Sequence, residues 1–123
     1  MIREIANLRV YVCPGEGPSL AEDRELSGLI GDLYSASAKV VAIPLARLGP
    51  DFLRLSTGVA GVVLQKLVNY RFKVAVLGNT AAAVATSDAL RDFIRESNRG
   101  QTVWFAADLA GLEEKLATGY GKA

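Results

Sequence analysis

Residues 56–78 read STGVAGVVLQKLVNYRFKVAVLG, and this run decides the fold class of the chain. It opens with a turn of small residues, Ser56, Thr57 and Gly58, continues as an apolar helix and ends in the apolar strand 73–78. A turn, a helix and a strand in direct succession indicate one unit of an alternating α/β fold. The turn also places two hydroxyls at a helix start, where exposed backbone amides and the helix dipole favour negative charge.

The same unit recurs on both sides of this run. Apolar stretches at 8–13, 39–44 and 102–106 predict three further strands. Amphipathic patterns predict helices after the first, third and fourth strands, with Ser19, Ser87 and Asp108 as candidate N-caps. We therefore expect an α/β fold with a largely parallel sheet of four to five strands, in a single domain spanning residues 1–123. The site of such a sheet lies beyond the carboxyl ends of its strands.

The composition excludes several classes of function. Fourteen basic and thirteen acidic side chains leave a net charge of +1, which predicts no nucleic-acid partner and no attraction to an anionic membrane. No stretch approaches the roughly 18 apolar residues of a membrane span, and the N-terminus lacks the apolar segment of a signal peptide. The lone Cys13 lies in an apolar run and indicates a reducing compartment, so we expect a cytoplasmic location.

Catalytic and metal-binding motifs are missing from the sequence. The chain contains no histidine, which removes the commonest general base, and no nucleophile and base stand at a recognisable spacing. A zinc site of the His and Cys type is excluded, and no acidic cluster resembles a magnesium or calcium loop. We therefore expect no catalytic residue, no metal and no cofactor. The sequence leaves open whether the protein is an enzyme and favours one that is not.

The connection before the helix at residue 57 is unusually long. It contains Gly49-Pro50 and runs for about a dozen residues, whereas most strand-to-helix connections have two to six. Long connections at strand ends are often functional, so Asp51 and Phe52 are candidates to face a partner or a ligand. A structural alternative stays open, in which Asp51 is a turn residue and Ser56 and Thr57 are helix caps worth about 1 kcal/mol.

Two segments carry a family resemblance: DFLRLSTGVAGVVLQKLVNYRFKVAVLGN (51–79) and SDALRDFIRESNRG (87–100). Together they resemble the bacterial domain-of-unknown-function family numbered 4180, over most of the chain. The order of elements is also similar to that of the STAS domains of anti-sigma-factor antagonists, which carry a Ser-[Ser/Thr]-Gly turn before a helix. That resemblance implies that Ser56 occupies the place of the hydroxyl that a partner kinase reversibly phosphorylates.

The sequence supports three hypotheses of function. The first is a small STAS-like regulatory or protein-interaction module, which works through residues 49–55, the Ser56-Thr57-Gly58 turn and the start of the next helix. The second is a binding protein or enzyme for a small anion (a nucleotide, a phosphate or an acyl compound), held by helix amides near Thr57 and by Asn79 and Thr80. The third is a structural homo-oligomer, such as a homodimer, because the helix at 59–68 is apolar nearly all round.

Overall fold

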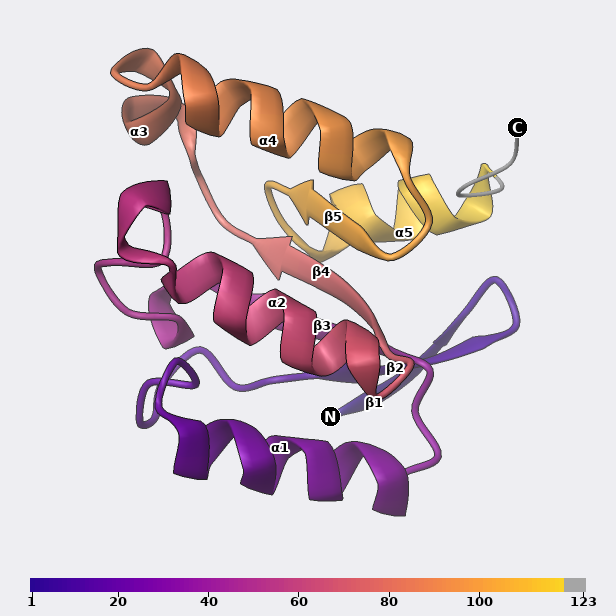
Figure 1. Ribbon diagram of the computed structural model, residues 1–123. Coiled ribbons are helices and arrows are strands. Elements are labelled where there is room, and N and C mark those ends of the chain that lie inside the picture. The colour runs from indigo at the N-terminus through magenta and orange to yellow at the C-terminus, as the bar shows by residue number, and fades with distance from the viewer. Residues whose placement is uncertain (119–123) are drawn as a thin grey trace.

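A five-stranded sheet forms the centre of the computed structural model, which describes residues 1–118 (Figure 1). Its strands are β1 (Ile2–Ile5), β2 (Leu8–Val12), β3 (Val40–Pro44), β4 (Lys73–Leu77) and β5 (Val103–Ala106), and they lie side by side in that order. β1 pairs with β2 in antiparallel fashion, whereas the other three pairs are parallel. The prediction of an α/β fold with a largely parallel sheet of four to five strands is confirmed. Residues 119–123, which the predicted domain includes, lie outside the described residues.

Helices connect the parallel strands and cover both faces of the sheet. They are α1 (Asp23–Ser35), α2 (Val59–Asn69), α3 (Ala81–Ala85), α4 (Asp88–Arg99) and α5 (Leu109–Ala117). Successive crossovers join neighbouring strands with the same right-handed sense, so α1, α2 and α4 lie on one face. α5 follows the last strand and packs on the other face (Figure 1). Within the described residues, no helix is both long enough and apolar enough to cross a membrane.

The strand β3 shows why the central strands of the sheet have continuous apolar sequences. Val41 and Ile43 join the core under α1 and α2, whereas Val40 and Ala42 join the core under α5. This alternation follows from the two-residue period of a strand. All four side chains are fully buried, as expected for a parallel strand that is covered on both faces.

Two of the three predicted helix caps are confirmed, and one is wrong. The side chains of Ser87 and Asp108 each accept a hydrogen bond from the amide three residues ahead, at 3.1 and 2.9 Å. Ser19 does not cap α1; its hydroxyl accepts from the amide two residues ahead, and the helix begins only at Asp23. The reason is that Leu20 is buried and its amide bonds the carbonyl of Arg47 at 2.6 Å, which holds the chain in a turn before the helix.

Two short elements have no counterpart in the sequence analysis. The first is β1, which a two-residue turn at Ala6 and Asn7 joins to β2. Both turn residues have positive φ angles, +50° and +68°, as a type I′ hairpin turn requires. The second is α3, a helix of five residues in the connection between β4 and α4. β1 forms one edge strand of the sheet, and α3 packs against α4.

Candidate functional site

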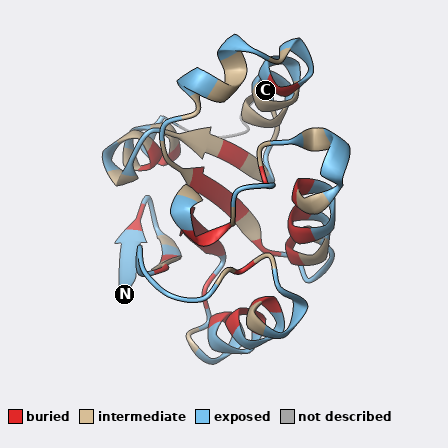
Figure 2. Ribbon diagram, turned by 90° about the vertical axis from the view of Figure 1, so that its left-hand side faces the viewer, coloured by how far each residue is buried: buried red, intermediate tan, exposed pale blue. Residues whose placement is uncertain are grey.

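The parallel strands β2 to β5 end at one edge of the sheet, and the connections that leave this edge hold every predicted site residue. Figure 2 looks onto this edge and shows that its loops are mostly exposed, with short buried stretches between them. The longest connection leaves β3 and contains two 3-10 turns, η1 (Leu45–Arg47) and η2 (Leu55–Thr57). This edge is therefore the place to look for a site, as the parallel topology predicts.

The Ser56 bend, which comprises η2 and Gly58, lies at the open rim of this edge. Ser56 and Thr57 are both exposed, but their hydroxyls differ in their contacts. The Thr57 hydroxyl lies 2.8 Å from the Arg54 carbonyl and 3.0 Å from the Asp51 carbonyl, and it accepts a 3.3 Å bond from the amide of Val59. Within residues 1–118, the Ser56 hydroxyl has no hydrogen-bond partner. Thr57 therefore fastens the bend, and Ser56 is free to contact another molecule.

The structure corrects the predicted role of Phe52. Asp51 and Phe52 were candidates to face a partner or a ligand, and Asp51 is exposed, 3.9 Å from the guanidinium of Arg54. Phe52, however, is only 1% exposed and belongs to the core under α1 and α2. An exposed phenylalanine side chain would forgo about 1.5–3 kcal/mol of burial free energy. Phe52 therefore anchors the long connection, and it does not face a partner.

Asn79 and Thr80, the predicted ligand-binding pair, lie in the connection after β4. The Asn79 side chain accepts a 2.9 Å hydrogen bond from the amide of Ala81, so it fastens the start of α3. Thr80 is half-buried and immediately precedes α3. Neither residue lines the hollow that contains Ser56. The predicted pair is therefore not part of the lining of that hollow.

The Ser56 groove is a hollow of about 590 Å³ between the long connection and the segment α3–α4. Its lining is Pro50, Leu53, Arg54, Leu55, Ser56, Ala83, Thr86, Ser87 and Ala89. Two of its other hydroxyls are already used, since Thr86 donates to the Ala83 carbonyl and Ser87 caps α4. The groups that the groove offers to another molecule are therefore the Ser56 hydroxyl, the exposed Arg54 guanidinium and an apolar wall.

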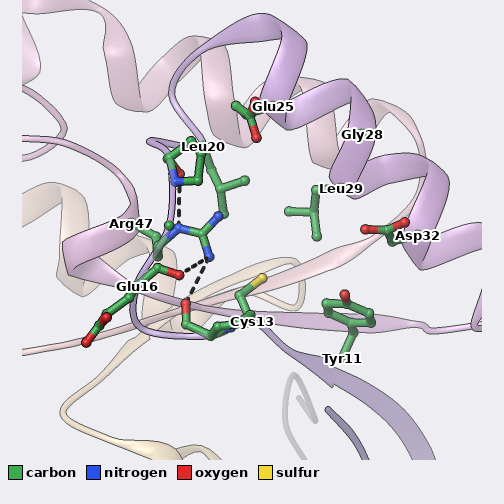
Figure 3. A pocket seen from close by; sticks show the side chains of 12 residues that line it. Tyr11, Cys13, Glu16, Leu20, Glu25, Gly28, Leu29, Asp32 and Arg47 are labelled. Atoms are coloured by element: carbon green, nitrogen blue, oxygen red, sulfur yellow. Dashed lines mark hydrogen bonds between the residues drawn. The ribbon is translucent and has the colours of Figure 1, made fainter.

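A second hollow at the same edge was missed by the sequence analysis. The Arg47 pocket has a volume of about 440 Å³ and lies between the end of β2, the connection after it, and α1 (Figure 3). Arg47 is only 8% exposed, and its guanidinium donates to the carbonyls of Pro14, Glu16 and Pro18 at 3.0, 3.4 and 3.0 Å. A Cβ at Gly17 would lie 2.9 Å from the Arg47 Cζ, so the loop approaches the guanidinium closely only because it has a glycine there.

One signal in the sequence could have pointed to Arg47. The loop PGEGP at 14–18 forms no helix or strand, so its carbonyls need hydrogen-bond donors from elsewhere in the chain. Arginine suits this task because its guanidinium carries five N–H donors in a planar array. The sequence, however, does not show which of its basic residues reaches the loop.

Burial determines the electrostatics of the Arg47 pocket. It raises the pKa of the Cys13 thiol to about 11, while Arg47 and the N-terminal ammonium oppose this shift and Asp32 adds to it. Burial also raises the pKa of Tyr11, helped by Asp32 and Cys13 and opposed by Arg47. Cys13 is therefore a neutral thiol at pH 7, a form that is a poor nucleophile. Across residues 1–118, no group of three His, Cys, Asp or Glu side chains is placed to hold a metal ion.

Comparison with known proteins gives one family match. No curated protein and no solved structure matches the chain. The model of the family described as "Domain of unknown function (DUF4180)" matches residues 5–116, which include every strand from β2 to β5, the Ser56 bend and the Arg47 pocket. The match covers most of the chain, and the chain therefore belongs to the DUF4180 family.

Proposed function

We propose that this protein is a small STAS-like regulatory module that binds a partner protein over the Ser56 groove and the first turns of α2. The observation that carries the proposal is the Ser56 hydroxyl, which is exposed, lines a groove and has no partner among the described residues. A polar group that the fold itself does not use is available for recognition or for modification. The proposal includes a cytoplasmic location for this protein and for its partner.

The surface next to the bend supports a protein partner. Val62, one turn into α2, is 66% exposed, which is high for a large apolar side chain. Gly58 and Gly61 lie four residues and one residue before Val62, and a Cβ at either position would meet nothing within 4 Å. This surface is therefore apolar and has few projecting side chains, so a partner's backbone could approach it closely. Exposed aliphatic side chains with polar groups around them are typical of protein interfaces.

Modification of Ser56 would change the charge of this surface. A phosphate on the hydroxyl adds close to two negative charges at pH 7. It would stand three residues before Val59, the first residue of α2, where the first-turn amides favour negative charge, and on the groove that Arg54 lines. These neighbours support Ser56, more than Thr57, as the point of regulation, because the Thr57 hydroxyl is already bonded three ways.

Photo-crosslinking tests the proposal in the source cell. A benzoylphenylalanine placed at Val62 should give one discrete adduct with a partner protein, whereas the same group at Tyr34, an exposed residue on α1, should not. Ser56→Ala should lower the adduct yield several-fold, because the interface loses a hydrogen bond worth about 1 kcal/mol. The same change should alter the free energy of unfolding by less than about 0.5 kcal/mol. Mass spectrometry of the recovered protein then reports phosphate on Ser56.

The alternatives give different outcomes in the same experiment. An adduct between two copies of this chain would instead support the homo-oligomer. A small anion in the Ser56 groove, which the exposed Arg54 favours, would make the adduct sensitive to added inorganic phosphate, and Arg54→Gln should remove that sensitivity. An adduct from Val62 that Ser56→Ala leaves unchanged would exclude the Ser56 hydroxyl from the interface.

A further inference from the structure

The Arg47 pocket has the features of a binding site, and it shares no lining residue with the Ser56 groove. Its floor is apolar, formed by Cys13, Leu20 and Leu29, all of which are buried. Polar groups stand around this floor. A cavity of about 440 Å³ with an apolar floor and a few polar groups is of the size and kind that hold small molecules.

Arg47 provides the first polar group. Its three hydrogen bonds use Nε and Nη1, and no described residue accepts one from Nη2. Within residues 1–118, no carboxylate lies within 4 Å of the guanidinium, so this largely buried charge has only carbonyl partners. Figure 3 shows Nη2 on the side of the guanidinium that faces the pocket. A buried charge of this kind is stabilised by a counter-ion, and here the pocket leaves room for one.

The carboxylates of Glu25 and Asp32 provide the second group. They stand seven residues apart on α1, and thus on one face of the helix, and both line the pocket. Neither carboxylate takes part in an ion pair or a hydrogen bond within the described residues. Figure 3 shows Asp32 across the pocket from Arg47, with Leu29 and Cys13 between them. The pocket therefore has a positive end and a negative side, separated by an apolar floor.

Gly28 keeps this space open. It lies inside α1, where a glycine destabilises a helix by roughly 1 kcal/mol relative to alanine. No close packing explains it, since a Cβ at this position would meet nothing within 4 Å. Gly28 lines the pocket, so any larger side chain here would enter it. A glycine at this position leaves that volume free.

We propose that the Arg47 pocket binds a small aliphatic zwitterion, a molecule with a carboxylate at one end and an ammonium group at the other. The carboxylate accepts from Arg47 Nη2, the ammonium group lies near Asp32 and Glu25, and the aliphatic chain lies on Leu29. A simple anion would be repelled by the acidic side of the pocket, and a simple cation would be repelled by Arg47. A ligand with both charges satisfies both ends.

Three probes of equal chain length test the charge requirement. 6-Aminohexanoate carries both charges, hexanoate carries only the carboxylate, and hexylamine carries only the ammonium group. Calorimetric titration of the full chain should show that 6-aminohexanoate binds at least tenfold more tightly than either of the others. Equal binding by hexanoate or by hexylamine would overturn the proposal in favour of a plain anion or cation site. Absence of binding by all three would overturn it altogether.

Two glycines of α1 offer matched variants. Gly28→Leu fills the pocket and should abolish binding of 6-aminohexanoate. Gly31→Leu changes the same residue type in the same helix, also in open space, but outside the pocket, and should leave the affinity unchanged. Asp32→Asn should lower the affinity for 6-aminohexanoate about tenfold and leave that for hexanoate unchanged or higher. Equal losses in the two glycine variants would overturn the assignment of the site to this pocket. Arg47 itself is left intact, because it fastens the loop 14–18.

Discussion

Gly58, the last residue of the Ser56 bend, has a φ of +79°, in the left-handed region that residues with a Cβ avoid. We predict that Gly58→Ala lowers the free energy of unfolding by about 1 kcal/mol, although no atom would clash with the new methyl group. Gly61→Ala is the matched control, because Gly61 lies inside α2, also in open space, and alanine should stabilise the helix by up to about 1 kcal/mol. Urea denaturation measures both; a stabilising Gly58→Ala would contradict the left-handed conformation.

The buried Cys13 thiol makes stability depend on alkaline pH. Its pKa is raised from 9.0 to about 11 in the folded chain. Below pH 9 the thiol is protonated in both states, so its contribution to stability is complete. Between pH 9 and pH 11 the unfolded chain loses this proton first, and the free energy of unfolding should fall by about 2–3 kcal/mol.

The control for this pH effect is Cys13→Ala, followed by denaturant titrations from pH 8 to pH 11. Tyr11, whose pKa is also raised, and the lysines titrate in both proteins, so only the difference between the two curves reports the thiol. The variant should show a flatter alkaline decline than the parent. Parallel curves would mean that Cys13 titrates alike in the folded and unfolded chains.

The residues whose roles the sequence analysis did not predict are those that act on distant segments of the chain. Phe52 was a candidate to face a partner or a ligand, and Arg47, in the same connection, was assigned no role. The structure buries both, one in the core and one against the carbonyls of a loop about thirty residues earlier in the chain. Ser87 and Asp108, by contrast, act on amides three residues away, so local sequence predicts their capping role.

At the scale of elements, β1 depends on an unusual turn. Ala6 has a φ of +50°, which costs an alanine about 1 kcal/mol or more, whereas asparagine tolerates this region. Ala6→Asn should therefore stabilise the hairpin of β1 and β2 by roughly 0.5 kcal/mol. Ala6→Val should destabilise the hairpin by more than about 1 kcal/mol, because a β-branched residue fits this region worst. Denaturation together with amide exchange in β1 checks this; equal effects of the two changes would argue against the turn.

This turn also explains why the sequence did not reveal β1. A hairpin is usually signalled by Asn-Gly or Asp-Gly between two apolar runs, and the chain has Ala6-Asn7 instead. β1 itself has three exposed residues out of four, so it lacks the apolar pattern of a buried strand. β3 and β4 are found easily because both faces of each strand are covered.

At the scale of the whole molecule, the alternating pattern predicts the parallel sheet and the edge at which the candidate site lies. The pattern does not give the sheet order, which the structure shows to be the order of the sequence. It also does not show that Asn79 and Thr80 are outside the lining of the Ser56 groove, since two loops at one edge can be near or far. The Ser56 bend was found from sequence because its residues are consecutive, and the Arg47 pocket was not because it joins three separate segments.

Neighbouring strands in the sheet are also neighbours in the chain. The core under α1 and α2 can therefore assemble through short loop closures. The other face differs: α5 must return to β1, and the ion pair between Glu113 and Arg3 spans 110 residues. We therefore expect the folding transition state to contain α1 and α2 on the sheet, with α5 docking afterwards. Weakening α5 should then hasten unfolding and leave the folding rate nearly unchanged.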